Sequence, residues 1–205
     1  VKFLNYLISY SLIIVLFGFI DDKYKLSPGS KIFFQIIPIV FLIQEGFFLS
    51  DLGNYTFIGT LELGSFKKIF TLLCCLLLIN AFNYIDGIDG LASLEYIFIL
   101  SNFSIFFYLN NNFEVANYIL FLILPILIFL FYNFSFFKVD KFFLGDCGSN
   151  LLGFIVSFIM INAYSIYGIH PAILIWTVSL IIYDFLTTNI IRFIFSKKIF
   201  KPGHD

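Results

Sequence analysis

The chain has 205 residues, of which 60% are hydrophobic and only 12% are charged, so it is too apolar for the wet surface of a soluble domain. Its formal net charge of −1 offers no basic surface for nucleic acid, and we expect no nucleic-acid partner. The three cysteines show no C-x-x-C spacing for zinc or a redox pair, and we expect no disulfide. The composition predicts an integral protein of a lipid bilayer.

Apolar windows of about 17 to 20 residues, long enough for a helix to cross about 30 Å of hydrocarbon, recur along the chain. They are apolar on every face, whereas the strands of a membrane barrel would alternate. These windows lie roughly at 3–20, 32–49, 69–85, 91–109, 115–132, 151–166 and 171–190. We predict an all-α polytopic membrane protein with about seven transmembrane helices in a single domain over 1–205, and a small outer β-hairpin within 50–68.

With this number of spans, the connections 21–31, 86–90 and 133–150 and the tail 191–205 all fall on one side of the membrane. The Lys and Arg residues on that side are Lys23, Lys25, Lys31, Lys138, Lys141, Arg192, Lys197, Lys198 and Lys201. The opposite side keeps only Lys2, Lys67 and Lys68. The excess of basic residues predicts that the first side is cytoplasmic.

The first polar motif, Asp21 and Asp22, ends the first span. Two adjacent carboxylates in a partly desolvated place repel each other, so the pair is expected to need a metal ion or a lysine nearby. Lys31 follows on the same side. The alternative is that the two charges only stop the helix at the membrane interface.

The second motif repeats a polar residue at every third position: Asn80, Asn83, Asp86 and Asp89. A straight helix would spread these four side chains over half of its circumference. Gly87 and Gly90 predict that the helix unwinds near Asp86, so that both aspartates turn inward while both asparagines stay on one helical face. An ordinary turn at this place is the alternative.

The third motif runs from Phe143 to Ser149 and leads into the span that starts at Leu151. Its backbone N–H groups and Ser149 are expected to point outward, where a phosphate could sit on the helix N-terminus. Asp146 would then be a magnesium ligand beside that phosphate.

Two further carboxylates, Glu95 and Asp184, lie toward the cytoplasmic ends of their spans and are candidates for a shared cleft. Asp184 and Arg192, about two helical turns apart, could instead form a structural ion pair.

In this order and on this topology, the three motifs resemble the polyprenyl-phosphate N-acetylhexosamine-1-phosphate transferase family, of the glycosyltransferase 4 type. The closest resemblance is to its bacterial undecaprenyl-phosphate N-acetylglucosamine-1-phosphate transferase branch, and the block from Asn80 to Ala92 is the most specific part. Members of the family typically have more spans, so the chain resembles a partial catalytic domain without the N-terminal helices. The ending from Lys201 to Asp205, with His204, resembles the start of the family's histidine-rich loop.

The resemblance implies an enzyme that transfers N-acetylhexosamine 1-phosphate, most closely N-acetylglucosamine 1-phosphate, from the UDP-sugar to undecaprenyl phosphate and releases UMP. This would be the first membrane step of a cell-envelope polysaccharide such as lipopolysaccharide or the cell wall. It further implies Mg²⁺ as cofactor, with Mn²⁺ as the alternative, and a multi-pass position in the bacterial inner membrane with the site facing the cytoplasm. A homodimer is left open.

Carried over onto this sequence, the resemblance makes Asp146 the metal ligand at the diphosphate and Asn83 a metal or diphosphate contact. Asp86 and Asp89 match cleft carboxylates near the nucleotide and metal. Asp21 or Asp22 is the candidate base toward the polyprenyl phosphate, although a phosphate with a second pKa near 6 scarcely needs one, so positioning is equally open. The expected substrate-binding residues are Lys31, Asn80, Asn133, Ser149, Asp184, Arg192 and His204.

Three other classes of protein are alternatives. Within the family, the rival is phospho-N-acetylmuramoyl-pentapeptide transferase of peptidoglycan synthesis. A CDP-alcohol phosphatidyltransferase has a similar Asp-Gly cluster, but this chain has Ser93 where that motif needs Arg. An ion-coupled transporter would bind its substrate near the membrane midplane, whereas these motifs lie at one surface.

Overall fold

A computed structural model of the chain describes residues 2–135 and 140–195. Its elements in chain order are α1 (Lys2–Tyr24), α2 (Pro28–Gln44), β1 (Asp51–Tyr55), β2 (Gly59–Glu62), a short 3-10 helix η1 (Gly64–Phe66), α3 (Lys67–Ile85), α4 (Leu91–Leu109), α5 (Phe113–Asn133), α6 (Gly145–Tyr167), α7 (Pro171–Thr177) and α8 (Ser179–Ile194).

Helices dominate the described residues, which confirms the predicted all-α polytopic architecture. Five of the described helices, α1, α3, α4, α5 and α6, are long and apolar enough to cross a membrane, and α7 with α8 would add a sixth if the pair is one span. The window 32–49 gives only the shorter helix α2, because the chain turns at Gly46, which has a φ of +93°. The window 171–190 is broken at Val178, where α7 and α8 are bent by 69°.

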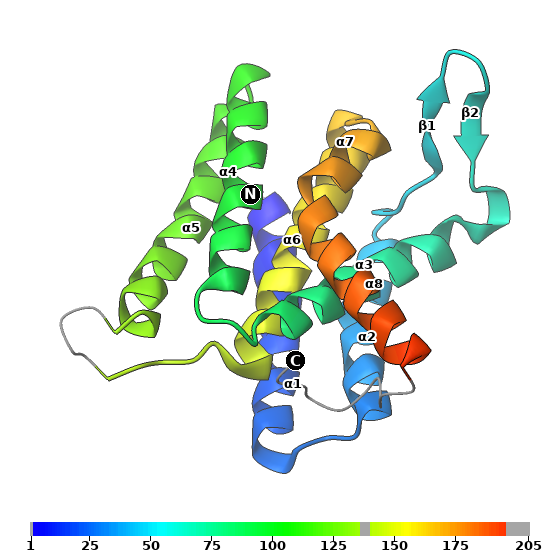
Figure 1. Cartoon of the computed structure of the whole chain (residues 1–205). Coiled ribbons are helices and arrows are strands. Elements are labelled where there is room, and N and C mark those ends of the chain that lie inside the picture. The colour runs from blue at the N-terminus through cyan, green and yellow to red at the C-terminus, as the bar shows by residue number, and fades with distance from the viewer. Residues whose placement is uncertain (1, 136–139, 196–205) are drawn as a thin grey trace.

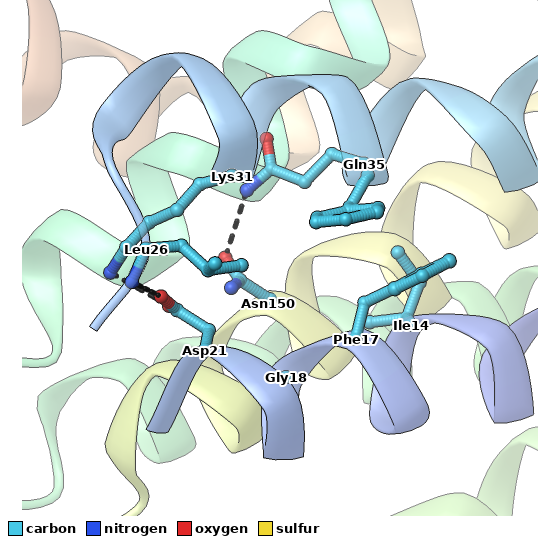
Figure 2. A pocket seen from close by; sticks show the side chains of 9 residues that line it. Ile14, Phe17, Gly18, Asp21, Leu26, Lys31, Gln35 and Asn150 are labelled. Atoms are coloured by element: carbon cyan, nitrogen blue, oxygen red, sulfur yellow. Dashed lines mark hydrogen bonds and ion pairs between the residues drawn. The ribbon is translucent and has the colours of Figure 1, made fainter. Parts of the chain in front are cut away.

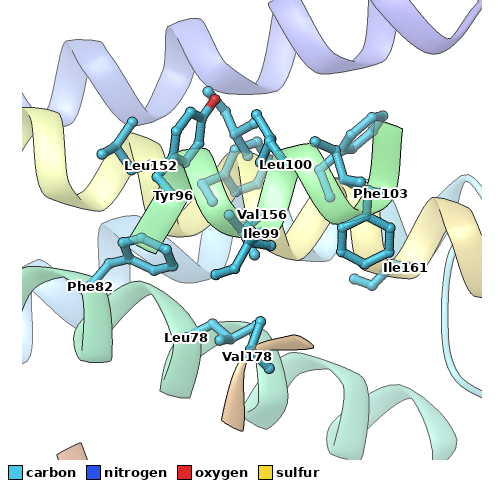
Figure 3. Close-up of a cluster of buried hydrophobic side chains, with 14 of the residues drawn as sticks. Leu78, Phe82, Tyr96, Ile99, Leu100, Phe103, Leu152, Val156, Ile161 and Val178 are labelled. Atoms are coloured by element: carbon cyan, nitrogen blue, oxygen red, sulfur yellow. The ribbon is translucent and has the colours of Figure 1, made fainter. Parts of the chain in front are cut away.

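The core of the bundle lies around α6, which packs against α1 and α3 along most of its length and also touches α4 (Figure 1). Phe82 of α3, Tyr96 of α4 and Val156 of α6 meet in the cluster of buried side chains of Figure 3. Water is absent from a bilayer core, so close packing rather than the hydrophobic effect holds such helices together. Because α6 is held on several sides, the position of Asp146 in its first turn is fixed by the packing of the bundle.

Two glycines allow the closest approaches to α6. A Cβ on Gly153 would lie 2.7 Å from the Cα of Ile79 in α3. A Cβ on Gly18 of α1 would lie 2.7 Å from the Cα of Cys147. Any larger residue at either position would push α6 away from its neighbour.

The predicted outer hairpin is present. β1 pairs antiparallel with β2, with Asp51 opposite Glu62 and Tyr55 opposite Gly59. The Tyr164 hydroxyl, near the end of α6, donates to Asp51 Oδ2 at 2.6 Å and so ties the hairpin to the bundle. In Figure 1 the hairpin lies at the top, whereas α1 ends and α2 begins at the bottom, and α6 begins in the lower half beside the turn from α3 to α4. The three polar motifs therefore lie away from the hairpin.

Candidate active site

The first and third motifs meet through one lysine. Lys31 Nζ lies 2.7 Å from Asp21 Oδ2 and also forms an ion pair with Asp146 Oδ2. These side chains come from the end of α1, the first turn of α2 and the first turn of α6. Lys31 meets the expectation of a lysine near the first motif, and it pairs with Asp21 of that motif.

Local backbone chemistry brings Lys31 to this place. The chain leaves α1 through Lys25, which has a φ of +49°, and Asp21 Oδ1 accepts the backbone N–H of Leu26 at 3.0 Å. Ser27 then caps α2 by accepting the N–H of Ser30, and Pro28 occupies the first turn, where its missing N–H costs nothing. Asp21 is therefore buried and holds the turn between the helices, whereas the side chain of Asp22 is exposed.

The second motif joins through Asn83, near the end of α3. Its Nδ2 donates to Asp146 Oδ1 at 3.2 Å and to Ser149 Oγ at 2.9 Å. The expectation that Ser149 points outward from a helix starting at Leu151 is wrong. The helix begins six residues earlier, at Gly145, so Ser149 has 0% exposure and its hydroxyl donates to the Gly145 carbonyl at 3.0 Å.

The predicted helix break at Asp86 is confirmed. α3 ends at Ile85 and α4 begins at Leu91. Gly90 has a φ of +72°, and a Cβ on it would lie 2.3 Å from the ring of Phe134, so both the backbone and the space require glycine.

The two aspartates of the break differ in their surroundings. Asp89 is exposed and forms an ion pair with Lys141, so it does not turn inward as expected. Asp86 is partly buried, and this burial raises the pKa of its carboxyl to about 7, with the negative charges of Asp146 and Asp89 acting in the same direction. Asp86 therefore lies within electrostatic reach of Asp146.

A set of amide side chains lies behind the charged residues. Asn80 Nδ2 donates to Gln35 Oε1 at 3.0 Å, and Gln35 Nε2 donates to Asn150 Oδ1 at 3.2 Å. Figure 2 shows Gln35 and Asn150 beside Lys31 and Asp21. Neither Gln35 nor Asn150 was among the predicted site residues, although each follows a charged site residue by four positions on the same helix.

The chain matches the family model for glycosyl transferase family 4 over residues 4–164, a range that contains all three motifs and Lys31. It belongs to this family. The predicted resemblance is thereby confirmed.

The names of the relatives refer to two kinds of transferase. The chain is 28% identical over 178 residues to the undecaprenyl-phosphate alpha-N-acetylglucosaminyl 1-phosphate transferase of Yersinia pestis, covering 85% of this chain and 49% of that protein. It is 30% identical over 166 residues to the probable undecaprenyl-phosphate N-acetylglucosaminyl 1-phosphate transferase of Bacillus subtilis, covering 81% and 44%. It is 34% identical over 194 residues to the phospho-N-acetylmuramoyl-pentapeptide-transferase of Campylobacter jejuni, covering 78% and 54%. The chain spans about half the length of the curated relatives it matches.

The family-derived metal site can be tested against the side chains present. In the described part of the chain, no three His, Cys, Asp or Glu side chains form a group that could hold a metal ion. Mg²⁺ is usually held by one or two carboxylates together with substrate phosphates and water, so the hard oxygens of Asp146 and nearby Asp86 fit such a site. Asn83 donates its amide nitrogen to Asp146 Oδ1, and its role as a metal or diphosphate contact stays a prediction.

Other predicted family residues lie away from this centre or have internal partners. Asn133 is buried and donates to the Phe142 carbonyl at 2.8 Å, which ties the end of α5 to the segment before α6. Arg192 of α8 is buried with its guanidinium 5.1 Å from the centre of the Tyr84 ring, and Asp184 is exposed on the same helix. Their roles as substrate contacts stay predictions, and His204 lies outside the described residues.

Proposed function

We propose that this chain carries the active site of an enzyme that transfers N-acetylhexosamine 1-phosphate from a UDP-sugar to undecaprenyl phosphate and releases UMP. The observation that carries the proposal is the meeting of Lys31, Asn83 and Asp146 at the adjoining first turns of α2 and α6. This arrangement gives a cation, an amide donor and a metal-binding carboxylate to a substrate made of phosphates.

The N-terminus of α6 strengthens the attraction for anions. A helix carries a partial positive charge at its N-terminus, and its first N–H groups have no partner within the helix. No side chain caps α6, whose first turn contains Asp146. Backbone N–H groups at the start of α6 are therefore available to donate hydrogen bonds to phosphate oxygens.

Charge neutralisation is the main requirement of the reaction. A phosphate monoester carries about −1.5 to −2 charges at neutral pH, and its attack on a diphosphate brings two anions together. Lys31 supplies one positive charge, and Asp146 with Asp86 would hold Mg²⁺, or alternatively Mn²⁺. The bound metal ion would supply the remaining positive charge beside the diphosphate.

The surroundings of the two adjacent aspartates favour different roles. Asp21 is buried, holds the turn after α1 and pairs with Lys31, which supports a positioning role. Asp22 is exposed and free to face the acceptor phosphate, either as a base or as an orienting group. Asp86, within electrostatic reach of Asp146, is assigned to the nucleotide side of the site, whereas Asp89 is held at the surface by Lys141.

The sugar is proposed to be N-acetylglucosamine, with the muramoyl-pentapeptide substrate as the second candidate. The relatives from Yersinia pestis and Bacillus subtilis support the first, and the 34% identity to the Campylobacter jejuni protein supports the second. Membranes containing the protein should be offered both UDP-sugars under the same conditions. A preference for the muramoyl substrate would reverse the order of the two candidates.

The catalytic proposal is tested by UMP release from UDP-N-acetylglucosamine in the presence of undecaprenyl phosphate. We expect release to require Mg²⁺ or Mn²⁺ and to be lost in Asp146→Asn. Asp140→Asn, an exposed aspartate six residues earlier, is the matched control and should retain activity. Unchanged UMP release in Asp146→Asn, or after chelation of the metal, contradicts the assignment.

The site is proposed to face the cytoplasm of a bacterial inner membrane, because the basic residues Lys23, Lys25, Lys31 and Lys141 lie at the end of the bundle that holds the motifs. A cysteine introduced at Lys23 should react with a membrane-impermeant thiol reagent only after the membrane is opened. Labelling of intact cells would place the site on the other side.

A further inference from the structure

The candidate site consists of two stacked layers on the same three helices. The charged layer is Lys31 of α2, Asn83 of α3 and Asp146 of α6, and the amide layer is Gln35, Asn80 and Asn150 on the same helices in the same order. On α2 and α6, which begin at this end of the bundle, the amide follows its partner by four residues. On α3, which ends there, it precedes its partner by three. With about 3.6 residues per turn, each amide lies one turn deeper on the same helical face.

The amide layer has a fixed direction. Asn80 Nδ2 donates to both Gln35 Oε1 and the Leu76 carbonyl, so its nitrogen is committed on α3 and toward α2. The oxygen of Gln35 therefore faces Asn80, and its nitrogen faces Asn150. Gln35 is 6% exposed and Asn150 is 8% exposed, so these hydrogen bonds are shielded from water.

Residues of both layers line the same cavity. A cavity of about 20 Å³ is lined by Asp21, Lys31, Gln35 and Asn150 (Figure 2). A rotation of α2 that displaced Gln35 would swing Lys31, one turn away on the same face, in the same direction. The contact of Lys31 with Asp146 therefore depends on the rotation of α2 about its axis, which the hydrogen bonds of Gln35 hold in place.

We propose that Gln35, Asn80 and Asn150 form a positioning layer that sets the rotation and register of α2, α3 and α6, so that Lys31, Asn83 and Asp146 converge. Interhelical hydrogen bonds contribute little to helix association in membranes, whereas buried polar residues are well suited to selecting one register. This assigns a role to Gln35 and Asn150 and makes Asn80 a positioning residue rather than a substrate contact. The inference rests on the proposed function only for its kinetic readout.

The kinetic test compares Gln35→Leu with Ile39→Leu in the full-length protein. Ile39 lies one turn deeper on α2 and is fully buried, so its variant disturbs packing without touching the amides. Since a misplacement of about 1 Å costs about a hundredfold in rate, Gln35→Leu should lower kcat by about ten- to a hundredfold per folded molecule while KM for the UDP-sugar changes little. Ile39→Leu should retain kcat. Asn80→Ala, at a less buried position, should reproduce the loss if Gln35→Leu folds poorly.

A second readout needs no turnover. Lysines carrying isotope-labelled dimethyl groups are observed by NMR, and the Lys31 signal is the one absent from Lys31→Arg. We expect this signal to move toward that of exposed lysines in Gln35→Leu and to stay in place in Ile39→Leu. If the parent protein releases no UMP, the proposed function fails, and the NMR result still decides the positioning layer.

Two outcomes overturn the positioning layer. The first is an unchanged Lys31 signal in both Gln35→Leu and Asn80→Ala. The second is recovery of full kcat when all three amides are replaced by Leu, because the layer would then serve only to satisfy its own buried polar groups.

Discussion

Replacing Gly153 by Ala tests whether the close approach of α3 and α6 sets the site. The added Cβ would lie 2.7 Å from the Cα of Ile79, whereas ordinary contact starts at 3.4 Å, so the helices must separate by about 0.7 Å. Asn83 lies one turn from Ile79 on α3 and moves with it. Its 3.2 Å hydrogen bond to Asp146 would lengthen to about 3.9 Å, beyond hydrogen-bond distance.

The expected effect follows from this displacement. Overpacking of a close helix contact costs about 1 to 3 kcal/mol of stability. A misplacement approaching 1 Å at the charged layer costs about ten- to a hundredfold in rate. Gly153→Ala should therefore lower both the thermal unfolding midpoint in detergent and the rate of UMP release.

The matched control is Gly29→Ala on α2, where no atom lies within 4 Å of the added Cβ and the backbone is helical. It should leave both measurements near those of the parent protein. UMP release by Gly153→Ala at the parent rate would refute the reasoning, because the approach of the helices would then have no influence on the site.

Three further predictions concern the charged residues and the helix break. Lys31→Met should abolish UMP release. It should also cost about 1 to 3 kcal/mol of stability, because the buried carboxylate of Asp21 loses its cation. Lys25→Met, at an exposed position, should change neither activity nor stability. Because the pKa of Asp86 is raised to about 7 in the fold, its protonation stabilises the metal-free protein as pH falls through that value. This pH dependence of the unfolding midpoint should vanish in Asp86→Asn, and its persistence there would exclude Asp86 as its source. Gly90→Ala should lower the unfolding midpoint and the activity, because the φ of Gly90 is +72° and the ring of Phe134 lies 2.3 Å from the added Cβ. Gly87→Ala, where the nearest atom is 3.8 Å from the added Cβ, should be tolerated. Equal effects of the two substitutions would contradict this explanation.

The sequence was most informative where one chain segment decides the structure. The glycines after Asp86 predicted the end of α3, and the turn residues Gly53, Asn54, Gly59 and Gly64 predicted the outer hairpin. The charge of Asp21 and Asp22 predicted a nearby lysine, since adjacent carboxylates need a counter-charge whatever the fold. In each case the residues that gave the prediction lie within about ten positions of the feature they predicted. The largest separation is that between Asp21 and Lys31.

The sequence was less informative where a polar side chain had to choose between a substrate and another helix. Ser149 looked available at a helix N-terminus, but the helix begins earlier and Asn83 of α3 takes up its hydroxyl. Asp89 looked like a cleft carboxylate, but it pairs with Lys141, 52 residues away. Periodicity shows which residues share a face of one helix, and it does not show which neighbour that face meets.

The bend between α7 and α8 has a similar origin. The window 171–190 has no Pro or Gly in its middle, so its composition predicts one continuous helix. The hydroxyls of Thr177 and Ser179 donate to the carbonyls of Leu174 and Trp176, and such local bonds compete with the helical ladder at Val178. Each of these residues alone is tolerated in a helix, and only their combination on both sides of one residue marks the break.

The stability of the site rests on the residues that are least polar. Lys31 and Asp146 are partly exposed, and ion pairs of this kind contribute little net stability. The approaches at Gly18 and Gly153 instead place α1 and α3 directly against α6, which brings the helices that carry Asp21 and Asn83 to the helix that carries Asp146. The charged layer can then stay open to a phosphate substrate, because the helices that carry it are already fixed by backbone contact and by the amides one turn deeper. We therefore expect that Lys31 can exchange Asp146 for a phosphate without loss of the fold, as long as it keeps its pair with the buried Asp21.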